Sequence, residues 1–222
     1  MQLPPHIRYR RTVPRRVSAA TARREYHHGD LRSALLDSVA RIIRESGASF
    51  VSIREVARRA RVSHAAPAHH FRNKSGLLTA FAAQGFERLA GTIAAAISSS
   101  RATAPPDVLA AMGRGYVRFA IDNPEHFDIM FRAELIDVEN EDYVRATDAA
   151  YGPLIATVEA AAEQGYLKGD HVVAAASAWS LVHGLAALWI SGRMQERTRA
   201  SDPNALAEAV TSLFVSSVMK RS

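Results

Sequence analysis

Apolar residues recur at intervals of three and four along most of the chain, and the strict alternation typical of half-buried strands is absent. Segment 29–47 shows this pattern well. Its apolar residues form one stripe of an expected helix: Leu31, Leu35, Val39, Ile42 and Ile43. Asp30 can cap the first turn of that helix, and Gly47 fits its C-terminal stop. The pattern predicts an all-α fold.

Glycine, proline and short polar residues divide the rest of the chain into further expected helices. The expected breaks are Gly47, Asn73, Ala104 to Asp107, Asn123-Pro124, Gly152-Pro153, Gly165, Gly169 and Asp202-Pro203. Pro124 fits the first position of a helix that restarts after Asn123.

Two short helices are predicted between Val51 and Phe71. Ser52 with Glu55 three residues later has the form of a capping box, so the first helix should start at Ile53 and run to about Ala60. Ser63 is placed to be the N-cap of the second. Two short helices joined by a tight turn have helix-turn-helix form.

At these residues the chain resembles the tetracycline-repressor-like (TetR) family of bacterial transcription regulators. The matching run extends from Tyr26 to Phe81, through "YHHGDLRSALL" and "VSIREVARRARVSHAAPAHHFRNKSGLLTAF". The resemblance implies a three-helix DNA-binding head. It also implies a larger helical C-terminal domain for ligand binding and dimerisation.

Pro67 stands inside the expected second helix. With Ser63 as N-cap, Pro67 is the fourth helical residue, so its missing N–H disturbs only the first turn. Pro67 and Phe71 are four apart and should both face inward. Ala65 and Ala66 would then face the DNA groove, where small side chains allow a close approach.

Several polar residues of the expected head can contact DNA. His64 at the helix N-terminus can reach a base edge or a phosphate, and His69 matches a phosphate-contacting histidine of the family. Lys74 beside the expected N-cap Asn73 is a further phosphate contact. The complete predicted DNA-binding set is Arg54, Ser63, His64, Ala65, Ala66, His69, Arg72 and Lys74.

Two residues depart from the family pattern. Arg61 occupies a turn position where the family commonly has glycine, and a positive φ there would cost about 1 kcal/mol. Ala68 stands where a tyrosine usually reaches a phosphate. Affinity would then depend more on Arg54, Arg58 and Arg72, with Lys74 and the N-terminal arginines.

Charge divides the chain into a basic and an acidic part. Residues 1–74 hold 16 Lys and Arg against 5 Asp and Glu, and residues 75–222 hold 12 against 17. This asymmetry is typical of a nucleic-acid-binding module joined to another domain, although a solvated basic surface is the alternative. We expect an Arg-rich disordered arm over 1–25, a head over 26–74 and a C-terminal domain over 75–222. The arm is either a minor-groove contact or a solvated extension.

The C-terminal domain carries less specific signals. Val172 to Ile190 is a 19-residue apolar stretch whose only strongly polar side chain is His183, so its length also allows a membrane span. Because the stretch is rich in alanine, a buried helix is the favoured interpretation. Its Trp179, His183 and Gly184 resemble the Trp-His-Gly subgroup of the family.

The last two expected helices should form a twofold homodimer. The final helix has one apolar stripe that needs a partner, formed by Leu206, Val210, Leu213, Phe214 and Val218. Two copies of each of the two helices would bury one another in a four-helix bundle. A twofold dimer implies a palindromic operator in double-stranded DNA.

These features predict a cytoplasmic, DNA-binding transcription regulator, in the family commonly a repressor, that responds to a small apolar effector. The candidate pocket residues are Tyr116, Phe127, Met130, Trp179 and His183, which could equally be plain core. No cofactor and no metal is expected, because His64, His69 and His70 lack the partners that zinc needs. The chain has no cysteine and no catalytic motif, which argues against an enzyme. A non-specific architectural DNA-binding protein remains the alternative.

Overall fold

The computed structural model describes residues 19–220, with side chains from Leu31 onward. Over this range the chain forms ten α-helices and one 3₁₀ turn, which confirms the all-α prediction. The elements are α1 (Ala19–Ser46), η1 (Ala48–Phe50), α2 (Ile53–Ala60), α3 (Ala65–Phe71), α4 (Lys74–Ser100), α5 (Pro105–Asp122), α6 (Pro124–Met130), α7 (Glu141–Glu163), α8 (His171–Ile190), α9 (Arg193–Thr198) and α10 (Pro203–Val218).

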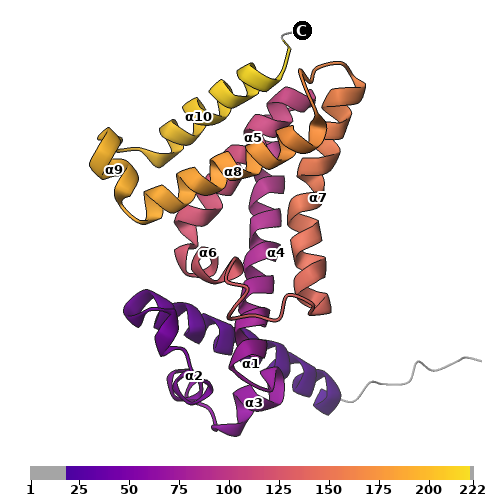
Figure 1. The fold of residues 1–222 in the computed structure, drawn as a ribbon. Helices are drawn as coiled ribbons and strands as arrows, with labels where there is room; N and C mark the ends of the chain where they lie inside the picture. Colours follow the sequence, from indigo (N-terminus) through magenta and orange to yellow (C-terminus); the bar gives the residue numbers. More distant parts are fainter. Residues whose placement is uncertain (1–18, 221–222) are drawn as a thin grey trace, which may run out of the picture.

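The molecule has a small lower part and a larger upper part (Figure 1). We call α1 to α3 with the first turns of α4 the head, and the remaining helices the body. The head encloses its own core, in which the predicted stripe of α1 packs against α2, α3 and α4. Leu77, Leu78 and Phe81 of α4 belong to this core, so the head extends past the expected boundary at residue 74.

Helix α4 runs from the head into the body, where it packs against α5, α6 and α7 (Figure 1). Helix α8 is the one helix in the described range that is long and apolar enough to cross a membrane. It packs on α5, α7, α9 and α10, and buries Ala174, Ala178, Val182 and Leu185 among others. This packing favours the body-helix interpretation over the membrane one.

Proline and asparagine mark the helix starts as expected. Pro124 is the first residue of α6, and Pro105 and Pro203 open α5 and α10. The side chain of Asn73 caps α4 by accepting a hydrogen bond from the N–H of Gly76, 2.9 Å away. Gly47 follows the last residue of α1 with a φ of 91°, as its predicted role as a stop requires.

Three local predictions were wrong. Asp30 lies inside α1, which begins at Ala19 because residues 19–25 are mostly good helix formers. The helix therefore enters the range expected to be a disordered arm, and residues 1–18 lie outside the described part. Ser63 is not the N-cap of α3. His64 takes that place, while the Ser63 carbonyl accepts from the N–H of Ala66 in a preceding turn.

The predicted break at Gly152-Pro153 was also wrong, because α7 continues through both residues. Proline removes one helical hydrogen bond there. Ala150 and Val158, on either side of the proline, are buried against neighbouring helices. Tertiary packing on both sides outweighs the local cost.

Candidate DNA-binding surface and ligand cavity

Helix α2 begins at Ile53 with Ser52 as its N-cap, as the sequence predicts. The carboxylate of Glu55, however, does not bond back to the N-cap as in a capping box. The hydroxyl of Ser52 accepts from the N–H of Glu55 at 3.2 Å. The Glu55 carboxylate binds Arg58 at 2.7 Å and Arg59 at 2.8 Å. Hydrogen bonds from these two arginines lower the pKa of Glu55 to about 2. Arg58 is therefore engaged within the head.

The turn between α2 and α3 is left-handed at Arg61, as its place in the turn suggested. Arg61 has φ 57° and ψ 41°, and its N–H bonds to the Arg58 carbonyl at 3.3 Å. The N–H of Val62 reaches the Ala57 carbonyl at 3.1 Å. These bonds close α2 in the usual way for a helix C-terminus. An arginine therefore forms the turn that glycine commonly forms.

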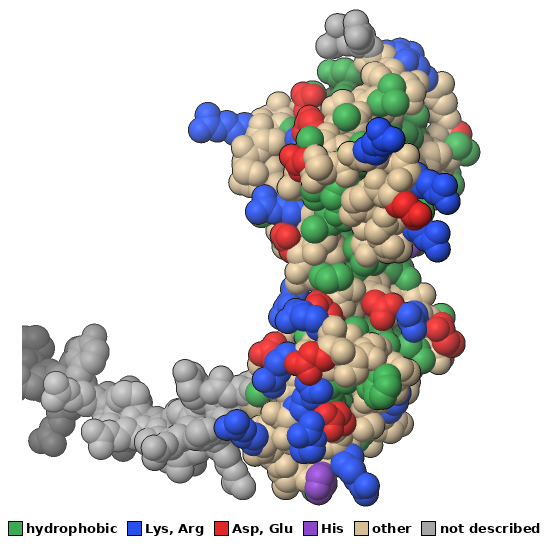
Figure 2. All heavy atoms as spheres, turned by 90° about the vertical axis from the view of Figure 1, so that its left-hand side faces the viewer, with side chains coloured by type: hydrophobic (Ala, Val, Ile, Leu, Met, Phe, Trp, Pro, Cys, Tyr) green, Lys and Arg blue, Asp and Glu red, His purple; other side chains and the backbone are tan. Residues whose placement is uncertain are grey.

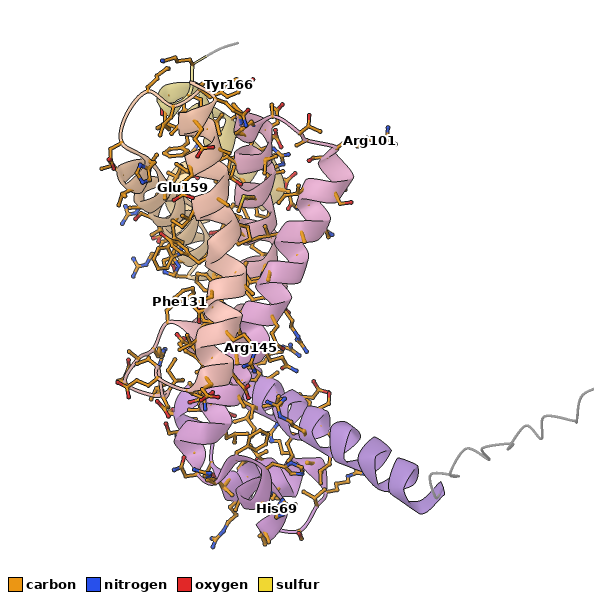
Figure 3. All side chains as sticks on the ribbon, turned by 90° about the vertical axis from the view of Figure 1, so that its right-hand side faces the viewer. His69, Arg101, Phe131, Arg145, Glu159 and Tyr166 are labelled. Atoms are coloured by element: carbon orange, nitrogen blue, oxygen red, sulfur yellow. The ribbon has the colours of Figure 1, made fainter. Side chains whose placement is uncertain are left out.

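Helix α3 buries one face and exposes the opposite one. Pro67 and Phe71 are buried. Because α3 starts at Ala65, Pro67 is its third residue, whose N–H would have no helical partner in any case. Figure 3 shows His69 at the end of the molecule farthest from the body, pointing outward.

The exposed residues differ in one place from the expected groove face. Ala65 is exposed, but Ala66 is half-buried, and Ala68 is the second small exposed residue of α3. His64, Ser63 and Arg54 are exposed as well. The outer face of α3 therefore combines two alanines with two histidines.

The connection from α3 to α4 is unusually tight. Arg72 has φ 64° and ψ −56°, and the N–H of Asn73 bonds to the Phe71 carbonyl at 2.7 Å. This is a γ-turn with a positive φ, the rarer and strained form. A Cβ on Gly76 would lie 2.2 Å from the Phe71 carbonyl oxygen, so only glycine fits there. The turn fixes Arg72 and Lys74 at the start of α4.

Basic side chains gather at the free end of the head. Figure 2 shows arginine or lysine side chains beside a histidine at the lower tip of the molecule. Arg72 and Arg54 are exposed and Lys74 is half-buried. Lys74 follows the N-cap of α4, where free N–H groups also favour an anion. The tip therefore has the charge and the small residues that a phosphate-lined groove requires.

The body contains a cavity of about 290 Å³ between α4, α5, α7, α8 and α10. Its lining is mostly apolar and includes seven aromatic side chains: Phe86, Tyr116, Phe131, Tyr143, Tyr151, Trp179 and Phe214. Of the five predicted pocket residues, Tyr116 and Trp179 line it. Phe127 and Met130 lie in the core instead, because α6 turns them toward α4 and α5.

The fifth predicted pocket residue, His183, does not line the cavity but contacts residues that do. Its Nδ1 lies 2.9 Å from the hydroxyl of Tyr116, and its ring contacts Phe131 with centroids 4.7 Å apart. Burial lowers the pKa of His183 and raises the pKa of Tyr116, so both are neutral at pH 7. Together they hold the aromatic wall of the cavity.

Sequence reasoning missed the part of the lining that α7 supplies. Tyr143, Thr147, Tyr151 and Leu154 recur at three- and four-residue intervals and share one face of α7. That spacing was available in the sequence. The mistaken break at Gly152-Pro153 cut the face in two.

Helix α6 and the segment after it join the head to the body. The buried carboxylate of Glu125 pairs with Arg44 of α1. The ring of His126 stacks on Phe81 of α4 with centroids 4.0 Å apart. At the other end of α6, Phe131 lines the cavity. One short helix thus touches both the head and the cavity wall.

Two family models match the chain. Residues 35–81 match the model "Bacterial regulatory proteins, tetR family", and residues 109–214 match "Tetracyclin repressor-like, C-terminal domain". The search of curated proteins found no match. The assignment to the Trp-His-Gly subgroup stays a prediction.

Solved structures share the fold over most of the chain. A protein of unknown function from Rhodococcus sp. RHA1 is 29% identical, with a TM-score of 0.74 over 88% of this chain and 98% of that one. The TetR family transcriptional regulator PfmR from Thermus thermophilus is 19% identical, with a TM-score of 0.64 over 82% and 96%. The fatty acid degradation regulator FadR from Bacillus halodurans is 16% identical, with a TM-score of 0.67 over 83% and 94%.

The helix-turn-helix head, the helical body and the two model matches agree with the resemblance seen in the sequence. Regulators of this family are not enzymes, and they are typically cytoplasmic. The chain belongs to the tetR family of DNA-binding transcriptional regulators.

Proposed function

We propose that the protein is a ligand-responsive repressor that binds a palindromic operator as a homodimer. The observation that carries this proposal is the outer face of α3, where Ala65 and Ala68 leave room for DNA beside His64 and His69. The side chains proposed to contact DNA are Arg54, Ser63, His64, Ala65, His69, Arg72 and Lys74. Ala66, being half-buried, would act through packing at the groove edge.

Helices α8 and α10 are the proposed dimer surface. They lie side by side on one side of the body (Figure 1). Helix α8 exposes several large apolar side chains, among them Leu188 at 46%, and α10 exposes Leu213 at 72%. A Cβ on Gly184 of α8 would meet nothing within 4 Å, so a partner helix has room to approach there. Apolar exposure of this kind is typical of an association surface.

The cavity is the proposed effector site. Its volume of about 290 Å³ lies just below the range of about 300 to 1,000 Å³ found for ligand pockets. A ligand in contact with Phe131 would act on α6, and through α6 on the head. Binding to one head arrangement in preference to another would then change operator affinity.

The first experiment is a mobility shift on DNA flanking the protein's own gene, against an unrelated duplex. The flank should bind about 10³-fold tighter, and His69→Ala and Lys74→Ala should weaken binding. Arg118→Ala, which changes an exposed arginine of the body, is the matched control. Equal binding of both duplexes, repeated in selection from random DNA, would favour a non-specific architectural protein.

Dimerisation has a separate test. Leu213 is the one exposed residue of the predicted α10 stripe, because the other four pack against the cores of the body. Leu213→Glu places a charge there and should give monomers in sedimentation velocity. Operator affinity should fall with it, because one head alone reads a half-site. If the Leu213→Glu variant stays dimeric, the dimer interface does not include this part of α10.

A further inference from the structure

We propose that the cavity in the body selects an organic cation with an apolar tail, such as a quaternary ammonium compound. This inference rests on the proposed effector site and adds the chemical class of the effector. It is drawn from the charge and the aromatic character of the lining.

Asp148 is the one residue of the Asp, Glu, Lys, Arg and His types among the described lining residues. It lies on α7 between Thr147 and Tyr151, with an exposed side chain. The lining includes no lysine, arginine or histidine. An anionic ligand would therefore meet a like charge and no counterion, whereas a cation would meet a carboxylate.

Arginines close to the lining are occupied elsewhere. Arg145, one turn before Asp148, pairs with Asp142 on the outer side of α7. Arg132, which follows Phe131, pairs with Asp128 at 2.6 Å. The charge of Asp148 therefore remains available to a ligand.

Aromatic rings beside Asp148 provide the second half of a cation site. Tyr151 and Trp179 meet edge to face with centroids 5.4 Å apart. Phe131 continues this wall, with its centroid 6.3 Å from that of Trp179. Trp179 is 39% exposed, so its ring is accessible from the opening. Faces of tryptophan and tyrosine attract quaternary ammonium groups, and a nearby carboxylate adds to this attraction.

The deep end of the cavity suits an apolar tail. Leu89, Ile93 and Leu109 are buried along α4 and α5 and line the cavity behind the aromatic wall. A linear or single-ring hydrocarbon would bury its surface there, while its charged head stays beside Asp148.

The test uses three compounds that share an octyl tail and differ in charge. Octyltrimethylammonium is a cation, octyldimethylamine oxide is neutral overall, and 1-octanesulfonate is an anion. Isothermal titration calorimetry of the full chain, below micelle-forming concentrations, gives each affinity without DNA. The cation should bind at least about fivefold tighter than the neutral compound, and the anion should bind weakest.

Asp148→Asn should weaken binding of the cation by about threefold to tenfold and leave the amine oxide within about twofold. The unchanged amine oxide affinity also shows that the variant is folded. Glu159→Gln, which removes an exposed carboxylate of α7 outside the lining, is the matched control. Tyr151→Leu should reduce the preference for the cation as well.

Equal binding of the three compounds, a preference for the anion, no binding of any of them, or no effect of Asp148→Asn would overturn the inference. Failure of the wider proposal gives a different result. In that case the cation binds and depends on Asp148, but saturating cation leaves operator affinity in the mobility shift unchanged.

Discussion

Arginine occupies every described non-glycine position with a positive φ. These residues are Arg61, Arg72, Arg101 and Arg199. Each directly follows the last residue of a helix, where glycine is usual and a positive charge is favourable next to the free carbonyls. In the head, Arg61 and Arg72 keep a cation at the tip that we propose faces DNA, at a conformational cost. That cost is consistent with a contribution to phosphate binding.

Replacing Arg72 by glycine separates stability from DNA binding. Because glycine relieves the strained γ-turn, the free energy of unfolding in urea should stay unchanged or rise by up to about 1 kcal/mol. Operator affinity should fall, and the slope of log affinity against log salt should flatten by about one unit.

Arg101→Gly is the control for this prediction. Arg101 has φ 56° and lies at the far end of α4 from the head (Figure 3). The Arg101→Gly substitution should raise the free energy of unfolding by a similar amount and leave operator affinity unchanged. If the Arg72→Gly variant keeps the wild-type slope of log affinity against log salt, Arg72 does not contact DNA.

His126 should make stability depend on pH. Burial, with a smaller contribution from Arg88, lowers its pKa from 6.5 to about 3. The folded state therefore binds this proton less readily than the unfolded state. The contribution of neutral, buried His126 to the free energy of unfolding is therefore complete above pH 6.5 and is lost as pH falls toward 3.

Between pH 6.5 and 4.5 the free energy of unfolding should fall by about 2 to 3 kcal/mol from this residue alone. Urea titrations across that range measure it. His126→Gln should remove most of the slope, while His171→Gln, at an exposed position, should keep it. An equally steep slope in His126→Gln would assign the pH dependence to other groups.

At the scale of helices, local chemistry allowed most starts to be predicted and long-range packing decided the exceptions. Ser52, Asn73 and Pro124 marked real helix starts because caps and first-turn prolines act within a few residues. The break predicted at Pro153 was wrong because α7 is held by helices that are distant in the sequence, namely α4, α5 and α8. The outer face of α3 was predicted in part, since Ala65 is exposed as expected but Ala68 takes the place expected for Ala66. The cavity does not follow from helical spacing, since five helices contribute to it.

The glycines of α4 and α5 test this difference between local preference and packing. A Cβ on Gly91, an exposed residue inside α4, meets nothing within 4 Å, so Gly91→Ala should stabilise the protein by about 0.5 to 1 kcal/mol. A Cβ on Gly113 would lie 2.6 Å from Cγ2 of Thr211 on α10, so Gly113→Ala should destabilise it. Thermal unfolding of the two variants measures both effects. Destabilisation by Gly91→Ala would show that α4 is bent or interrupted there.

On the scale of the whole molecule, regulation requires a physical connection between the cavity and the head. Helix α6 contacts both, through Phe131 at one end and Glu125 at the other. The N–H of Asp137 also donates to Thr79 of α4 at 2.8 Å, which ties the segment after α6 to the head. Ile129 and Ile136 are buried in the head core rather than in the body core. A shift of α6 would therefore change how the head is held.

Arg44→Gln should reduce this coupling while leaving each binding step in place. The substitution removes the charge that faces the buried Glu125, but Arg44 contacts neither the cavity lining nor the exposed face of α3. Affinity for octyltrimethylammonium and operator affinity without ligand should each stay within about threefold of wild type. The ratio of operator affinities with and without saturating ligand, about 5 to 150 in coupled systems, should move toward one. Arg41→Gln, one turn earlier on the exposed side of α1, is the control and should keep the wild-type ratio. An unchanged ratio in Arg44→Gln would mean that another connection carries the signal. Helix α4 both lines the cavity and enters the head core, and Tyr143 of α7 lines the cavity and packs against that core.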